Sequence, residues 1–327
     1  MRRALRPVAV AVAAILAAAT LAGCASVSDD AQDSSLAALE TTEPKPRTRR
    51  PPADDCGETR YQSRRPSVLP RAGHMPAGTY MHTIQEEGHL VAGVDQNSLG
   101  LGYFNPVTRE LEGFDIDVVG EVARAIFGGE DFADHIVYKA ISTPQRESAI
   151  YFGDVDIVAS AFSITCKRQQ QMSFSSVYHR TRQRLLVPDD SDDDSFEDLR
   201  DKKVCVTKKS TSIVRLEESG AIPVPVDLRS DCLAKLQERE VAAITSDETI
   251  LFGFCQQDPQ TKIVGPSLAA ERYGLAINKL HQDFVSFVNA ALLRGHDRLE
   301  RSRKRWLQGL EGSGDDDITD CKRPDTS

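Results

Sequence analysis

The sequence predicts an α/β fold in which helices cover both faces of a largely parallel sheet, and two observations support this. Strand-like apolar runs and helix-like amphipathic runs alternate between residues 90 and 168, which is the order of βαβ units. Segment 115–127 places its apolar residues on one helical face, as expected for a helix that packs on a sheet. Helices of this kind connect parallel strands by crossing over the sheet.

The expected elements follow one another along the chain. A helix ends near Gly88, and helix 115–127 stops at Gly128-Gly129, because glycine favours helix C-termini. Ser142-Thr143-Pro144 caps and begins another helix,. Strands are expected at 90–94, 135–139, 155–158, 183–188, 203–206, 241–244, 263–264 and 273–277. Two of them, 183–188 and 273–277, are expected to cross between two units. Further helices are expected after 210–212 and at 283–293 and 297–307.

The segment 153–168, G-D-V-D-I-V-A-S-A-F-S-I-T-C-K-R, couples an apolar strand to a helix start. Ser163 or Thr165 can cap that helix, and Arg168 falls within its first turn,. Backbone N–H groups, hydroxyls and a guanidinium therefore converge at the C-terminal end of a strand. Open α/β sheets bind ligands at this edge, and these donors suit a carboxylate.

Two motifs resemble one known family. The run D-I-V-A-S-A-F-S-I-T-C-K-R at 156–168 is followed by Phe174-Ser175, and G-F-D-I-D-V at 113–118 opens a helix. Together they resemble family-3 extracellular solute-binding proteins over roughly 84–310. The resemblance implies a two-lobed periplasmic-binding-protein fold of type II, with two parallel-rich sheets joined by two hinge strands and a ligand between the lobes. Lobe 1 would comprise 78–183 plus 273–312, and lobe 2 would comprise 184–272.

The two ends of the chain lie outside these lobes. Arginines at 2, 3 and 6 precede the apolar run 8–22, and L-A-G-C ends at Cys24. Residues 1–24 therefore read as a lipoprotein signal peptide with Cys24 as the lipidated residue, the alternative being an ordinary signal peptide with a chance cysteine. Segment 25–77 is expected to be a flexible tether and 313–327 a tail. The protein would sit on the outer face of the cytoplasmic membrane as a lipid-anchored monomer.

Charge and cysteine usage exclude several functions. The net charge is −9 without a basic, aromatic-rich stripe, so nucleic-acid binding is not expected. The spacing of cysteines and histidines matches no metal motif,, and no cofactor is expected. Without Cys24, six of the seven cysteines remain, and six allow 15 disulfide pairings. We propose Cys205–Cys232, Cys56–Cys166 and Cys255–Cys321, and actinobacterial lipoproteins resembling this chain carry cysteines that match the first four.

A free amino acid is a zwitterion, so a closed site needs a partner for each charge. The resemblance places Arg168 at the α-carboxylate, and Ser163 with the backbone of Ala161 nearby. The alternatives are a surface arginine and a serine that only caps a helix. Asp247 matches the family's acidic position for the α-ammonium. Its neighbour Glu248 is the alternative partner, and Asp247 can also cap the next helix.

The remaining candidates determine the ligand side chain. Relatives that bind glutamate or aspartate carry an arginine at the position of Arg146, whereas a solvated surface arginine is the alternative. Thr211 and Ser212 resemble the family's second-lobe turn, although Lys208-Lys209-Ser210 stands where many relatives have a glycine. Asp95 ends the first strand, before a loop that relatives use to cover the side chain.

The function predicted from these residues is binding without chemistry. The chain would bind glutamate, aspartate or their amides and present the amino acid to an ABC permease. A variant within this class would signal through a membrane sensor protein instead. The rival is a dehydratase-like enzyme on the same fold, with Asp95 or Glu248 as general acid,. Neither carboxylate has a supporting catalytic constellation, so the chain is not expected to be an enzyme.

Overall fold

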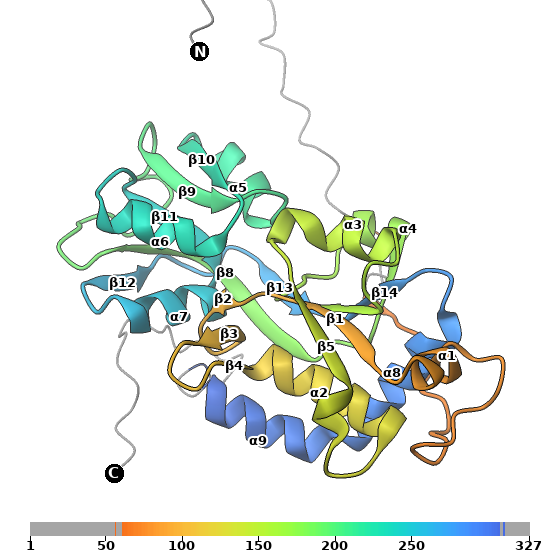
Figure 1. Ribbon diagram of the computed structural model, residues 1–327. Coiled ribbons are helices and arrows are strands. Elements are labelled where there is room, and N and C mark those ends of the chain that lie inside the picture. Colours follow the sequence, from red (N-terminus) through yellow and green to blue (C-terminus); the bar gives the residue numbers. More distant parts are fainter. Residues whose placement is uncertain (1–55, 57–60, 308–309, 311–327) are drawn as a thin grey trace, which may run out of the picture. The chain divides into compact units, whose positions relative to one another are not determined.

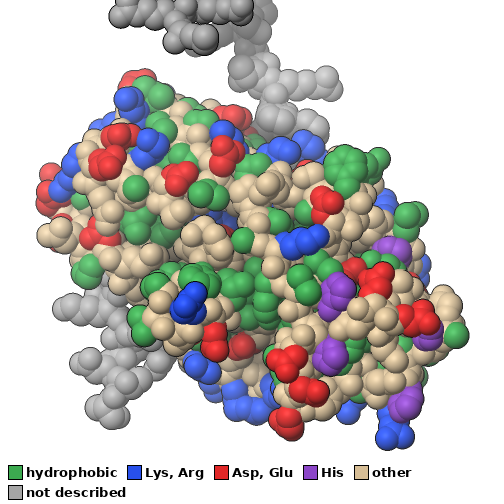
Figure 2. All heavy atoms as spheres, viewed as in Figure 1, with side chains coloured by type: hydrophobic (Ala, Val, Ile, Leu, Met, Phe, Trp, Pro, Cys, Tyr) green, Lys and Arg blue, Asp and Glu red, His purple; other side chains and the backbone are tan. Residues whose placement is uncertain are grey.

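The computed structural model describes residue 56, residues 61–307 and residue 310, all within one compact unit that spans 52–327. Two separate sheets organise this unit into two lobes (Figure 1). On the face seen in Figure 2, acidic and basic side chains are interspersed. No helix among the described residues is long and apolar enough to span a membrane. The expected signal peptide, Cys24 and the tail 313–327 lie outside the described residues.

The sheet of lobe 1 has the strand order β5-β1-β6-β14-β7. Strand β1 (Leu90–Val94) pairs in parallel with β5 (Ile136–Ala140) and β6 (Ile157–Ala159). Strand β14 (Ala276–Asn278) is antiparallel to both β6 and β7 (Met172–Phe174). The C-terminal ends of β1 and β6 therefore lie at the same edge of the sheet.

Helices pack on this sheet through the apolar faces that the sequence indicates. Helix α2 (Phe114–Phe127) buries Val118, Val122 and Ile126 and ends at Gly128, whose φ is 73°. It packs against α8 (Gln282–Arg294) and α9 (His296–Trp306). The other helices of lobe 1 are α1 (Tyr80–Glu87), η2 (Phe132–His135), η3 (Thr143–Gln145), α3 (Arg146–Tyr151) and α4 (Cys166–Gln171).

Lobe 2 contains the sheet β10-β9-β11-β8-β12. Its strands are β8 (His179–Pro188), β9 (Lys203–Thr207), β10 (Ile222–Val226), β11 (Ala243–Asp247) and β12 (Thr261–Val264). Its helices are α5 (Ser212–Ser219), α6 (Arg229–Gln237) and α7 (Glu248–Gln257). Strand β11 is parallel to β9 and antiparallel to β8.

Two antiparallel strands connect the lobes, but one lies elsewhere than expected. The first residues of β8 pair with β13 (Ala270–Tyr273), with His179 opposite Tyr273 (Figure 1). The return crossing is therefore β13, whereas the expected range 273–277 mostly falls outside it. After Gly274, the chain enters β14 in the sheet of lobe 1. The run 273–277 is apolar throughout, so its local pattern contains no signal that separates the two strands.

Two further segments, 96–103 and 61–77, also differ from expectation. Segment 96–103, expected as a loop, forms part of a ribbon of β2 (Asn97–Ser98), β3 (Gly102–Asn105) and β4 (Glu110–Glu112). Residues 61–77, assigned to the tether by composition, contact lobe 1. Ser67 N donates to Ser286 O at 3.0 Å, and Gly73 N donates to Ile126 O at 2.8 Å. The described part of this segment therefore extends lobe 1.

Two of the expected disulfides are present. Cys56–Cys166 joins the N-terminal segment to the first residue of α4, and Cys205–Cys232 joins β9 to α6. Cys255 is also disulfide-bonded. Its proposed partner, Cys321, lies outside the described residues.

Candidate functional site

A small polar cavity lies between the lobes, with a volume of about 20 Å³. It brings together seven of the predicted site residues from both lobes. Its lining consists of Thr143, Arg146, Ala161, Ser163, Arg168, Thr207, Ser210, Thr211, Ser212, Arg229, Ser246, Asp247 and Ile250. Asp95, and Glu248 as the alternative partner of the α-ammonium, are absent from this lining.

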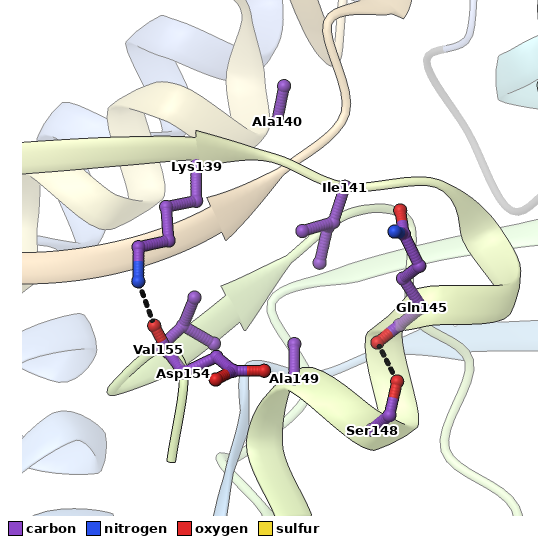
Figure 3. A pocket seen from close by; sticks show the side chains of 8 residues that line it. All are labelled: Lys139, Ala140, Ile141, Gln145, Ser148, Ala149, Asp154 and Val155. Carbon is purple, nitrogen blue, oxygen red and sulfur yellow. Dashed lines mark hydrogen bonds between the residues drawn. The ribbon is translucent and has the colours of Figure 1, made fainter. Parts of the chain in front are cut away.

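A larger open cavity of about 410 Å³ lies on lobe 1, between β5 and α3 (Figure 3). It is lined by Lys139, Gln145 and Asp154 together with small and apolar side chains. The Lys139 ammonium is already held by the carbonyl oxygen of Asp154 at 2.5 Å. Because this cavity lacks the convergent charged groups of the interlobe cavity, it is the poorer candidate for a zwitterion.

Arg168 enters the interlobe cavity from α4. Thr165 caps this helix, since its Oγ1 accepts a hydrogen bond from Arg168 N at 3.2 Å, so Ser163 is not the cap. The guanidinium donates to Ser163 O at 2.7 Å and to Lys209 O of lobe 2 at 2.9 Å, and its Nε lies 3.4 Å from Glu147 Oε1. Arginine has five N–H donors, so one donor remains on each terminal nitrogen.

Arg146, the first residue of α3, is 3% exposed. Its Nε donates to Thr143 O at 3.2 Å, and its Nη1 donates to Ser160 O at 2.9 Å and Ala161 O at 3.0 Å. Both donors of Nη2 are therefore left over, and no described carboxylate forms an ion pair with this guanidinium. Its pKa is lowered well below the ordinary value by burial and then by the charges of Arg168 and Arg229.

Phe162 supports both arginines and was not singled out from the sequence. The guanidinium carbons of Arg146 and Arg168 lie 4.3 and 4.6 Å from the centre of its ring. Phe162 is fully buried, so these cation–π contacts are shielded from water, where such contacts are strongest. The aromatic residue thus keeps two like charges beside one cavity.

Ala161 has a left-handed backbone with a φ of 45°. This conformation is costly for a residue other than glycine. Hydrogen bonds of its N–H and of its carbonyl group hold it in place. Ala161 N donates to Asp115 Oδ2 at 2.8 Å, and its carbonyl accepts from Arg146. The turn places the backbone of Ala161 and the buried Ser163 at the cavity, as the sequence predicts.

Asp247 ends β11 and is 5% exposed. Its Oδ2 accepts a hydrogen bond from Tyr273 Oη at 2.6 Å, whereas Oδ1 is buried without a hydrogen-bond partner among the described residues. It does not cap α7 through its side chain. Burial, and next the charge of Glu271, raise the pKa of Asp247 to about 7, whereas the hydrogen bond from Tyr273 lowers it.

The turn before α5 completes the lobe 2 side of the cavity. Thr211 and Ser212 lie at the N-terminus of this helix, whose first N–H groups have no partner within the helix,. Thr211 Oγ1 accepts a hydrogen bond from Gln183 Nε2 at 3.1 Å. Ser210 Oγ is buried and without a hydrogen-bond partner in the described structure. These groups can hydrogen-bond an anionic or polar ligand.

Two carboxylates lie elsewhere than the sequence indicates. Asp95 does not line the cavity, because its Oδ2 is paired with Arg229 Nη1. Glu248 is not the free partner of an ammonium, because it pairs with Arg184 at 3.0 Å and Arg182 at 2.9 Å. The partner arginines are distant in sequence from these carboxylates, so no local pattern indicates either pairing.

Arg229 lines the cavity, and the sequence analysis missed it. It begins α6, three positions before Cys232. Nothing in the local sequence L-R-S-D-C distinguishes it from a surface arginine. The only available signal was the proposed disulfide, which fixes its helix to β9.

The fold and the site together are those of a two-lobed binding protein with a polar, charged cavity between its lobes. A family model for bacterial extracellular solute-binding proteins, family 3, matches residues 90–309. The chain belongs to this family, as the sequence motifs predict. This is a family of solute-binding proteins, which confirms the prediction that the chain is not an enzyme.

Individual relatives and structures agree with this assignment. The chain is 32% identical over 261 residues to the glutamate-binding protein GluB of Corynebacterium efficiens, covering 76% of this chain and 87% of GluB. It is 29% identical over 230 residues to the ABC transporter glutamine-binding protein GlnH of Bacillus subtilis, covering 69% of this chain and 83% of GlnH. The cysteine-binding protein of Campylobacter jejuni has a TM-score of 0.67 at 22% identity, covering 73% of this chain and 97% of that protein. Such structural neighbours confirm the type II periplasmic-binding-protein fold.

Proposed function

We propose that this protein is a receptor for an amino acid with an acidic side chain, glutamate or aspartate, with their amides as weaker ligands. The observation that carries the proposal is Arg146, a buried guanidinium that lines the cavity and forms no ion pair among the described residues. A buried charge without a partner is costly, and an anionic ligand group supplies that partner.

Each charge of such a ligand has a counterpart. Arg168 retains one donor on each terminal nitrogen, and these two donors suit the two oxygens of the α-carboxylate. The unpartnered Oδ1 of Asp247 suits the α-ammonium. Arg146 then takes the side-chain carboxylate, or the carbonyl oxygen of an amide. Relatives named as glutamate- and glutamine-binding proteins support this ligand class.

Binding requires the lobes to separate. A volume of 20 Å³ holds about one water molecule,, which is far too small for an amino acid. The two crossing strands, β8 and β13, provide the connection about which the lobes can open. Hinge closure around the ligand, a known motion of two-lobed binding proteins, would then exclude water from its charges.

Delivery to an ABC importer completes the proposal. The expected lipid on Cys24 would hold the receptor at the outer face of the cytoplasmic membrane, with the following residues as a tether. Family membership and the GlnH relative, named as an ABC transporter protein, support delivery of a captured amino acid. The receptor is expected to act as a monomer.

Isothermal titration and thermal-shift screening against the twenty amino acids test the ligand class. A ligand that binds only the folded state stabilises it by about 2.7 kcal/mol at a hundredfold excess over Kd. We expect the largest shifts with glutamate and aspartate, and smaller shifts with glutamine and asparagine. Tighter binding of arginine or of a neutral aliphatic amino acid would overturn the assignment of Arg146.

A further inference from the structure

We propose that Asp95 and Arg229 form a latch between the lobes, which holds the site closed and directs Arg229 into the ligand cavity. Asp95 is then a positioning residue of the site and not a ligand contact. The proposal rests on the arrangement of hydrogen bonds around these two side chains, and it holds whichever solute binds.

Arg229 belongs to lobe 2, but its guanidinium is held entirely by lobe 1. Nη1 donates to Asp95 Oδ2 and to Ser98 Oγ, the latter at 3.2 Å, and Nη2 donates to Ser160 O at 2.9 Å. Arg229 is 5% exposed and also lines the interlobe cavity. Its position at the ligand therefore depends on closure, because its hydrogen-bond partners all lie in the opposite lobe.

Asp95 is fixed within its own lobe before the other lobe arrives. Its Oδ1 accepts from Asn97 N at 3.0 Å, and its Oδ2 accepts from Ser98 Oγ at 2.8 Å. The adjacent ribbon also packs tightly on its backbone. A Cβ at Gly102 would lie only 2.5 Å from the carbonyl oxygen of Asp95, so this contact requires glycine. The carboxylate is thus preorganised to receive the arginine.

The arginine is fixed in a similar way. Arg229 is the first residue of α6, and Cys232 in the same helix turn is disulfide-bonded to Cys205 of β9. The covalent bond restrains the start of α6 against the sheet of lobe 2. Both halves of the latch therefore sit on rigid parts of their lobes, and closure can bring them together with little further ordering.

The latch differs energetically between the open and closed forms. With the lobes apart, both side chains face water and need no partner. In the closed form they are buried, and removing one member of a buried ion pair leaves the other charge without compensation. Asp95→Asn should therefore destabilise the closed form alone. Apparent affinity should fall, because closure around a bound ligand then no longer forms the Asp95–Arg229 pair.

The test measures the distance between the lobes by pulsed electron resonance. Spin labels are attached through unnatural amino acids at the exposed Tyr151 in α3 and Val214 in α5, which leaves the disulfides intact. Asp95→Asn should increase the fraction of the longer distance relative to the otherwise unsubstituted protein measured under the same conditions, without and with ligand. An unchanged distance distribution in Asp95→Asn would overturn the proposal.

Glu121→Gln is the matched control. Glu121 is also a buried carboxylate, and its pairing with Arg298 at 2.7 Å lies within lobe 1. This variant should leave the distance between the lobes unchanged, whatever its melting temperature; a change equal to that of Asp95→Asn would contradict the latch. Ser98→Ala, which removes one hydrogen bond from each member of the latch, should shift the distances in the same direction by less.

Titration with glutamate adds a second readout. Asp95→Asn should bind about tenfold more weakly and shift towards the short distance at saturation, since closure then depends on the ligand alone. The ligand-free distances test the latch even if glutamate fails to bind. A failed latch and a failed ligand assignment are therefore distinguishable.

Discussion

Tyr273 Oη donates a hydrogen bond to Asp247 Oδ2 at 2.6 Å and leaves Oδ1 of the same carboxylate unpartnered among the described residues. Tyr273 ends the crossing strand β13, whereas Asp247 ends β11 in lobe 2. The connection between the lobes thus fixes one oxygen of the carboxylate while the other remains for a ligand. This relationship determines how the site should respond to pH.

Amino-acid affinity should fall as the pH falls below about 7. Burial raises the pKa of Asp247 to about 7, but an ammonium ligand needs the ionised carboxylate. Proton and ligand then compete, so affinity should fall by about tenfold per pH unit well below this pKa. Calorimetry between pH 8 and pH 5 measures the effect. In Asp247→Asn, affinity should be low and nearly independent of pH over this range; a slope as steep as that of the unsubstituted protein would exclude Asp247.

Tyr273→Phe should move this dependence to higher pH. The tyrosine hydrogen bond lowers the pKa of Asp247 and so opposes the effect of burial. Without the hydroxyl, the ionised carboxylate loses a donor, and its pKa rises further. At pH 7 the variant should bind several-fold more weakly, with affinity recovering at pH 9. A uniform loss at all pH values would instead indicate that the aromatic ring, and not the hydrogen bond, was disturbed.

Arg146 and Arg168 should have different effects on specificity. Arg146→Gln should weaken glutamate by about tenfold or more, because a charge-assisted hydrogen bond contributes roughly 1.5–3 kcal/mol, and should weaken glutamine much less. Arg168→Lys should weaken both ligands alike, because lysine cannot bind two carboxylate oxygens as arginine does. Calorimetry with both ligands and both variants measures the difference. Equal losses of glutamate and glutamine in Arg146→Gln would show that Arg146 is structural.

The Cys205–Cys232 disulfide should affect both stability and binding. It closes a loop with a sequence separation of 27, for which the chain-entropy model gives roughly 3–4 kcal/mol. The double variant Cys205→Ala/Cys232→Ala should therefore unfold at a lower temperature. It should also bind glutamate more weakly at temperatures where it is fully folded, because α6 positions Arg229. Unchanged affinity in the folded variant would show that the disulfide stabilises the fold but does not contribute to binding.

Local sequence patterns predicted the elements with strong periodicity. Strand β1 spans Leu90–Val94 and α2 ends at Phe127, both as expected. Strand β10, Ile222–Val226, was missed because its two prolines argue against a strand,. The structure accommodates them because β10 is an edge strand, where fewer N–H groups are needed. Sheet position is a tertiary property that a local window does not contain.

For the candidate site too, local motifs predicted some residues and tertiary contacts determined others. Arg146, Arg168 and Asp247 were predicted because each belongs to a motif that the family resemblance identifies, and the structure gathers them at one cavity. Arg229 was missed and Asp95 was given a different contact. These two residues are 134 positions apart, and neither segment contains a signal for the other.

The sequence by itself determined the α/β class and the family and indicated the charged residues proposed to bind an amino acid, because periodicity and short motifs are local properties of the chain. The tertiary structure alone decided which charges remain available. It paired Glu248 with Arg182 and Arg184, and Asp95 with Arg229, but left Arg146 without a carboxylate partner among the described residues. Pairing depends on distance and burial across the two lobes, and these arise only when segments far apart in the sequence pack together.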